Sequence, residues 1–135
     1  MIVFRGTSAQ VLLEPTQVLP DALAALEYLP TGGRTPLAAA LDRARGYLTP
    51  STLLVLLTDG RANLAQHGGD PWQEALDVAR TIDCSTLVVD TETAANRLGQ
   101  CAELATILGA RYLSLEELAD LEHVAVDATR HRQEA

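Results

Sequence analysis

The sequence contains no lysine, so its ten positively charged side chains are all arginines, against eighteen aspartates and glutamates. The formal net charge is −8 at pH 7. A surface that binds nucleic acid must neutralise phosphates, and an anionic membrane also attracts basic side chains, so both partners are disfavoured. An acidic surface suits divalent cations, basic protein partners, or simply solubility, and these alternatives stay open.

Metal-binding clusters and targeting segments are also lacking. The two cysteines, Cys84 and Cys101, and the three histidines are scattered along the chain, which gives no zinc-type ligand set. No apolar run approaches the roughly 20 residues that span a bilayer, and the N-terminus has no signal-peptide pattern. We therefore expect a cytoplasmic protein in which both cysteines are reduced core residues.

Short apolar runs alternate with segments of helical periodicity along the 135 residues, which predicts one domain of the α/β class. Two short strands at 3–4 and 9–13 should form an antiparallel hairpin. A helix is expected after Pro20, and a second helix should begin at Pro36 with Thr35 as N-cap and bury Leu37, Leu41, Ala44 and Leu48. A strand at 52–57, buried on both faces, is followed by a helix that begins at Pro71 with Asp70 as N-cap. The remaining expected elements are a strand at 85–89, a helix at 98–108 closed by Gly109, a strand at 111–113, and a final helix opened by Ser114.

Helix and strand units that follow one another in this way favour right-handed crossovers and a parallel sheet. Functional crevices of such sheets lie at the carboxyl ends of the strands. This predicts a rim that carries Thr35, Asp59 and Asp90.

Asp59 directly follows the 52–57 strand, and Gly60 lets the backbone turn away from its carboxylate. It is either a ligand for a hard cation such as Mg²⁺ or a turn residue bonded to its own loop. Thr35 stands behind two glycines at a helix start, where its hydroxyl can bind a metal or merely cap the helix.

Common catalytic signatures are missing. The loop at 31–35 matches neither G-x-x-x-x-G-K-[ST] nor G-x-G-x-x-G, and no G-x-S-x-G occurs. Asp59 and Asp90 could pair across adjacent strand ends, which leaves a small phosphotransfer or hydrolase enzyme as an alternative. Two carboxylates without a positioned histidine, however, do not make a catalytic constellation.

Two segments carry a resemblance to a known family. The sequences T-G-G-R-T-P-L at 31–37 and L-V-L-L-T-D-G-R-A-N at 54–63 resemble the von Willebrand factor A (vWA) family, and more narrowly the C-terminal domain of the D-type subunits of magnesium chelatase. The segments V-F-R-G at 3–6, D-P-W at 70–72, V-D-T-E at 89–92 and L-G-A-R-Y at 108–112 fit the same family. The resemblance runs essentially from end to end.

The resemblance implies a Rossmann-like fold, with a mostly parallel twisted sheet and helices on both faces. It also implies a metal-ion-dependent adhesion site, in which Thr35 would be the second part and Asp59 the third. The first part, a D-x-S-x-S loop after the family's first and central strand, does not occur in this sequence. We therefore expect a single incomplete, truncated vWA domain over 1–135 with a polar tail at about 130–135, and weak or absent Mg²⁺ binding.

The function implied by the resemblance is protein interaction. In this family the domain assembles with an AAA+ ATPase subunit for magnesium insertion into protoporphyrin IX, and Gly32, Gly33, Arg34 and Asp90 would contact the partner. The alternatives are a subunit of a cobaltochelatase or other ATPase-linked complex, and a fragment without activity that forms a homo-oligomer through its incomplete sheet.

Overall fold

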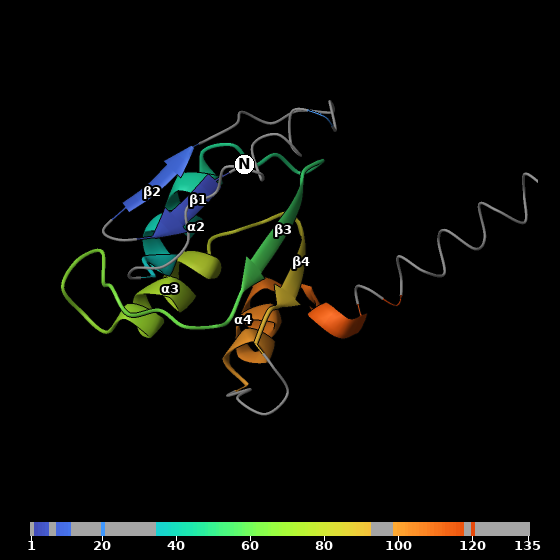
Figure 1. Cartoon of the computed structure of the whole chain (residues 1–135). Coiled ribbons are helices and arrows are strands. Elements are labelled where there is room, and N and C mark those ends of the chain that lie inside the picture. Colours follow the sequence, from blue (N-terminus) through green and yellow to red (C-terminus); the bar gives the residue numbers. More distant parts are fainter. Residues whose placement is uncertain are drawn as a thin grey trace, which may run out of the picture. The chain divides into compact units, whose positions relative to one another are not determined.

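A computed structural model describes residues 2–5, 8–11, 20, 35–92, 99–117 and 120. The chain forms two compact units (Figure 1). The first unit comprises Met1–Thr52 and Arg61–Ser85, and the second comprises Leu53–Gly60 and Thr86–Ala135. The interpretation of 1–135 as one incomplete vWA domain stays a prediction.

A hairpin opens the first unit. Strands β1 (Ile2–Arg5) and β2 (Ser8–Val11) pair antiparallel, with Ile2 opposite Val11 and Arg5 opposite Ser8. This confirms the predicted hairpin, and the last two residues of its expected second strand, 12 and 13, lie outside the described residues. The helix predicted after Pro20 lies outside the described residues.

Helix α2 (Leu37–Arg45) buries one apolar face, as the spacing of its leucines predicts. Leu37, Leu41 and Ala44 are buried, whereas Leu48 lies beyond the helix end and is only half-buried. The buried residues of the helix are Leu37, Ala38, Ala40, Leu41 and Ala44.

The predicted N-cap of α2 was wrong by one residue. Pro36 is the N-cap, and no side chain caps this helix. The carbonyl of Pro36 accepts the first helical hydrogen bond, from the Ala40 N–H at 3.0 Å. Thr35 lies one position too early because Pro36 has a ψ of 67°, outside the helical range, so Leu37 is the first helical residue.

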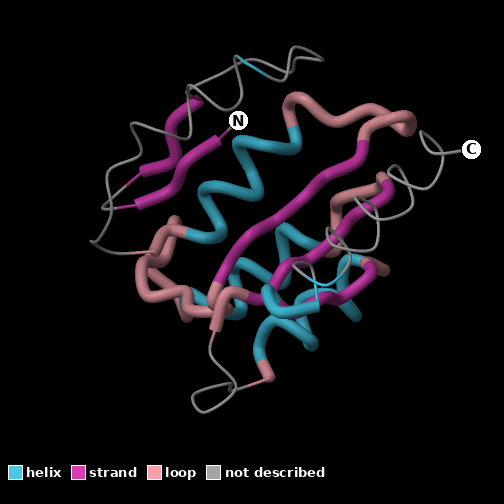
Figure 2. Tube along the Cα trace, turned by 45° about the vertical axis from the view of Figure 1, so that its right-hand side comes forward, coloured by secondary structure: helices cyan, strands magenta, loops and turns pink. Residues whose placement is uncertain are grey.

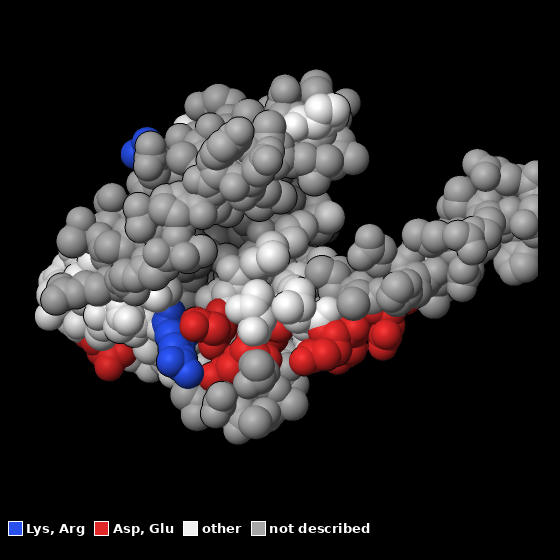
Figure 3. Space-filling model, viewed as in Figure 1, with Lys and Arg blue, Asp and Glu red and all other residues white. Residues whose placement is uncertain are grey.

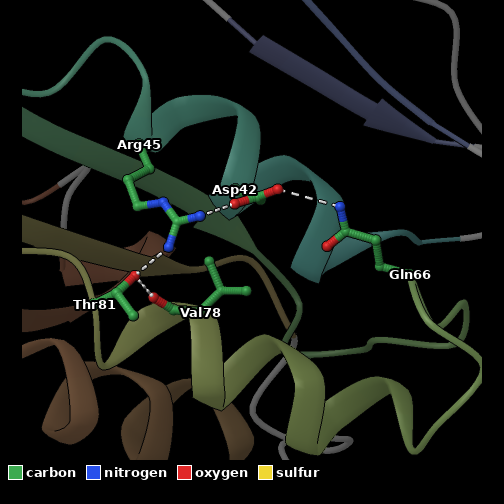
Figure 4. A network of polar contacts seen from close by, with 5 residues as sticks. All are labelled: Asp42, Arg45, Gln66, Val78 and Thr81. Atoms are coloured by element: carbon green, nitrogen blue, oxygen red, sulfur yellow. Dashed lines mark hydrogen bonds and ion pairs between the residues drawn. The ribbon is translucent and has the colours of Figure 1, made fainter.

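Helix α3 (Pro71–Ala79) begins as predicted, with Asp70 accepting a hydrogen bond from the Gln73 N–H at 2.9 Å. It packs against α2 within the first unit. Polar contacts join the two helices at the surface (Figure 4): Arg45 of α2 pairs with Asp42 and donates to Thr81 Oγ1 at 2.9 Å.

The second unit contains a sheet of three strands in the order β3 (Leu53–Thr58), β4 (Ser85–Asp90) and β5 (Arg111–Ser114). β4 and β5 are parallel, and the arrow of β3 points the same way as that of β4 (Figure 1). Helix α4 (Gln100–Leu108) connects β4 to β5 and packs on β5 (Figure 2). The predicted α/β class and parallel sheet are confirmed.

One expectation about the sheet was wrong. β3 was predicted to be buried on both faces, but Leu53, Val55 and Leu57 are 61%, 45% and 54% exposed, while Leu56 and Thr58 are buried. The physical reason is that side chains alternate between the two faces of a strand, and only the face of β3 that carries Leu56 and Thr58 is covered. β4 fits the expectation better, because Val88 and Val89 are fully buried.

No helix in the described part of the chain is both long enough and apolar enough to cross a bilayer.

Candidate functional site

The carboxyl end of β3 forms a tight turn at the predicted position. The Gly60 N–H donates to the buried Thr58 hydroxyl at 3.1 Å, and Gly60 has a φ of +77°. A Cβ at Gly60 would lie 3.0 Å from Cys101 Sγ and 3.1 Å from the Cys101 nitrogen. Only glycine fits this turn, which leaves Asp59 half-buried at the end of the strand.

The end of β4 lies beside it in the same unit. The Thr91 N–H donates to the Thr58 carbonyl at 3.0 Å, and Cys101 Sγ donates to the same carbonyl at 3.4 Å. The first turn of α4 therefore contacts the end of β3. The predicted neighbourhood of the two strand ends, with Asp59 after one and Asp90 on the other, is present in the second unit.

Asp90 is only 1% exposed. Its Oδ1 accepts a hydrogen bond from the Glu92 N–H at 2.9 Å, and its Oδ2 accepts one from the Tyr112 hydroxyl of β5 at 2.6 Å. Both carboxylate oxygens therefore serve contacts inside the unit. The role of Asp90 in binding a partner stays a prediction.

The pKa of the Cys101 thiol reflects the charges at these strand ends. Burial raises the pKa of its thiol to about 12, assisted by the negative charge of Asp90, its hydrogen bond with Asp90, and the charges of Asp59 and Glu92. The predicted core position is confirmed for Cys101, which is 2% exposed, whereas Cys84 is only half-buried. The strand ends thus form an acidic environment, in which a cation would be favoured and an anion disfavoured.

Thr35 belongs to the first unit, whereas Asp59 belongs to the second. The Thr35 N–H donates to Asn63 Oδ1 at 2.6 Å, and the Asn63 N–H donates to the Thr35 carbonyl at 3.2 Å. Gly32, Gly33 and Arg34 lie outside the described residues.

The loop after Asn63 is held by one carboxylate that the sequence did not single out. Glu74 of α3 accepts hydrogen bonds from the main-chain N–H groups of Gln66 at 2.5 Å, His67 at 3.1 Å and Gly69 at 3.0 Å. Desolvation raises the pKa of Glu74, but these N–H groups outweigh it and the net pKa is lowered. The only sequence signal for this contact is a glutamate in the first turn of α3, three residues after Pro71.

Magnesium prefers oxygen ligands, usually one or two carboxylates with several retained waters. Asp59 and Thr35 offer donors of that type, but only one carboxylate and one hydroxyl. Among the residues that the structure describes, no group of three or more histidine, cysteine, aspartate or glutamate side chains is placed to hold a metal. Each of these donors fits Mg²⁺ in kind, and the binding of Mg²⁺ stays a prediction.

The charge distribution agrees with a preference for cations. On the face drawn in Figure 3, acidic side chains occupy more of the coloured surface than basic ones. This matches the net charge of −8.

Comparison of the sequence with those of known proteins identifies relatives of this chain. The chain is 36% identical to the magnesium-chelatase 60 kDa subunit of Rhodobacter capsulatus, over 95% of the chain and 26% of that subunit. It is 37% identical to the magnesium-chelatase 67 kDa subunit of Chlorobaculum tepidum, over 85% of the chain and 22% of that subunit. The chain is homologous to part of these magnesium-chelatase subunits.

The chain spans about a quarter of the length of the curated relatives it matches. A similar level of identity, 38% over 87% of the chain, relates it to an uncharacterized protein of Mycobacterium tuberculosis. No protein-family profile matches the chain, so the vWA assignment stays a prediction.

Proposed function

We propose that this chain is a vWA-type protein-interaction domain of a protein similar to the D-type subunits of magnesium chelatase. It would assemble in the cytoplasm with an AAA+ ATPase subunit that drives magnesium insertion into protoporphyrin IX. The homology to the 60 and 67 kDa chelatase subunits carries this proposal. A subunit of a cobaltochelatase or another ATPase-linked complex is the alternative.

The proposed contact surface is the rim that the sequence predicts. Asp59 would hold a Mg²⁺ ion mostly through water, Thr35 would add a hydroxyl donor, and Gly32, Gly33 and Arg34 would contact the partner. Two observations support the role of Asp59: Gly60 turns the backbone away from it, and the acidic surroundings of Cys101 favour a cation nearby. A carboxylate supplied by the partner would complete the coordination sphere.

Calorimetric titration of Mg²⁺ and Mn²⁺ into the purified chain tests the metal part. We expect weak binding that Asp59→Ala abolishes. The matched control is Asp77→Ala, which removes an exposed carboxylate of α3 paired with Arg80 at 2.6 Å. Binding that survives Asp59→Ala, or that falls equally with Asp77→Ala, would refute a specific role of Asp59.

Copurification tests the partner part. The chain is mixed with the ATPase subunit of a magnesium chelatase and, separately, with that of a cobaltochelatase, in the presence of Mg²⁺. We expect retention by the first and not by the second. Retention by the cobaltochelatase subunit alone would favour the alternative complex, and retention by neither would contradict an ATPase-linked role.

The structure also favours a second candidate, self-association through β3. No described strand pairs with the outer edge of β3, and three large apolar side chains of this strand are exposed. Such an edge is a template for another strand. The incomplete sheet would then be extended by a second copy of the chain.

A further inference from the structure

Asn63 forms hydrogen bonds with both main-chain polar groups of Thr35. The Thr35 N–H donates to Asn63 Oδ1 at 2.6 Å, and the Thr35 carbonyl accepts from the Asn63 N–H at 3.2 Å. The two residues are 28 positions apart in sequence. A reciprocal pair of hydrogen bonds fixes the direction of the backbone, whereas a single bond would leave it free to pivot.

These two hydrogen bonds matter because Thr35 lies just before the start of α2. The next residue, Pro36, is the N-cap of α2, so the main chain of Thr35 is outside the helical hydrogen-bond ladder. Its N–H would otherwise turn to water, and the helix would not fix where its hydroxyl points. Asn63 supplies from outside the helix the constraint that a regular cap would supply from within.

Asn63 follows Asp59 by four residues along the chain. The residue that holds Thr35 therefore lies on the segment that leaves the end of β3. We propose that Asn63 is a positioning residue, which fixes the Thr35 main chain at the start of α2 and thereby sets the hydroxyl for cation binding. This inference rests on the proposed function for its second half and on the Thr35 contacts alone for its first.

The rest of the loop is anchored independently. The Gln66 side chain donates to Asp42 Oδ2 of α2 at 3.2 Å (Figure 4), and Glu74 holds the loop's main chain at Gln66 and Gly69. Removing the Asn63 side chain should therefore free Thr35 without releasing the whole loop. It also makes Gln66→Ala a matched control, because that change removes an amide side chain from the same loop that bonds to α2 elsewhere.

The test compares the complete chain with Asn63→Ala, Asn63→Asp and Gln66→Ala. Hydrogen exchange of the Thr35 amide is followed by NMR, and Mg²⁺ affinity is measured by calorimetry. Loss of the acceptor in Asn63→Ala should speed Thr35 exchange about five- to tenfold and weaken Mg²⁺ binding severalfold. Asn63→Asp keeps an acceptor oxygen and should restore both, and Gln66→Ala should change neither.

Unchanged Thr35 exchange in Asn63→Ala would overturn the positioning role. So would faster exchange with unchanged Mg²⁺ affinity, because Asn63 would then be merely structural. A wild-type chain that binds no Mg²⁺ would refute the proposed metal site and, with it, the cation-binding half of this inference. Thr35 exchange would still decide the first half, so the two failures are distinguishable.

Discussion

Gly60 has a left-handed backbone conformation and lies close to Cys101. A larger residue at this position would therefore lose stability in two ways, which can be separated by experiment. Gly60 has a φ of +77°, and a Cβ added there would lie 3.0 and 3.1 Å from Cys101 atoms, whereas Gly68 has a φ of +81° with open space around it. Gly68→Ala should cost about 1 kcal/mol of unfolding free energy from the backbone alone. Gly60→Ala should cost about 2–3 kcal/mol, because Cys101 must also move. Urea denaturation checks both, and equal losses would show that the contact is unimportant.

Cys101 provides a pH-dependent prediction at the same scale. Burial and the neighbouring acidic groups raise the pKa of its folded thiol to about 12, from an ordinary value of 9.0. Below pH 9 both states keep the proton and the full contribution to stability is present. Above it the unfolded thiol ionises first, so stability should fall as the pH rises toward 12. The urea midpoint is measured against pH, with Cys101→Ala as reference. The reference variant should lose less stability across this range, and parallel curves would contradict the prediction.

Residues were predictable from the sequence where their role depends on near neighbours. Asp70 as N-cap and the turn at Gly60 after Asp59 are local features of this kind. Asn63 was missed because its partner Thr35 lies 28 residues away, and only the fold brings them together. Thr35 was wrongly predicted to cap α2 because the sequence does not show that Pro36, with a ψ of 67°, stays outside the helix.

Among the elements, β3 combines an outer edge with which no described strand pairs and an uncharged sequence, L-L-V-L-L-T. An antiparallel pairing of two copies centred on Val55 would place each exposed Leu53 opposite the other copy's Leu57. The same pairing would keep the two Asp59 carboxylates at opposite ends, whereas parallel pairing would bring them together. We therefore predict a concentration-dependent antiparallel dimer that Val55→Lys dissociates.

Analytical ultracentrifugation over a wide range of concentrations measures this association. Leu115→Lys is the control, because Leu115 is 47% exposed and lies outside the sheet. A chain that stays monomeric throughout, or a dimer that loses affinity equally in both variants, would contradict pairing through β3.

Glu74 makes the loop between β3 and α3 sensitive to acid. The pKa of its carboxyl is lowered from the ordinary value of 4.5, against the effect of desolvation, by hydrogen bonds from main-chain N–H groups. The bonds are therefore at full strength above pH 4.5 and weaken as the pH falls through the lowered pKa. Amide exchange of Gln66, His67 and Gly69, corrected for its intrinsic pH dependence, should lose protection there. In Glu74→Gln the neutral acceptor should give protection that is lower and independent of pH, and an unchanged pH profile in that variant would refute the role of Glu74.

The elements themselves were largely predictable, since periodicity and cap residues depend on the local sequence. The hairpin, α2, α3, α4 and the parallel strands all form close to the predicted positions, with ends that differ by up to three residues. Burial of β3 was not predictable, because an apolar run reads alike whether it lies at the centre of a sheet or at its edge. That distinction depends on which strands are neighbours, which the run itself does not encode.

At the scale of the whole molecule, the proposed metal site predicts that Mg²⁺ changes the stability of the chain against unfolding. Thr35 is in the first compact unit and Asp59 in the second. If Thr35 takes part in binding the cation, Mg²⁺ should stabilise the first unit, by about 1.4 kcal/mol at a free Mg²⁺ concentration ten times the dissociation constant. The single tryptophan, Trp72 on α3, lies in the first unit.

We therefore expect Mg²⁺ to raise the unfolding midpoint that is followed by Trp72 fluorescence. Asp59→Ala should abolish this shift and Asp77→Ala should preserve it. Ca²⁺ serves as a second probe, because it is larger and takes more oxygen ligands, so a site with two protein donors should discriminate poorly between the ions. A Trp72 midpoint that ignores Mg²⁺ while calorimetry still detects binding would mean that Asp59 binds the cation without Thr35. Each unit would then respond to metal separately, and Thr35 would be left with a role in partner contact alone.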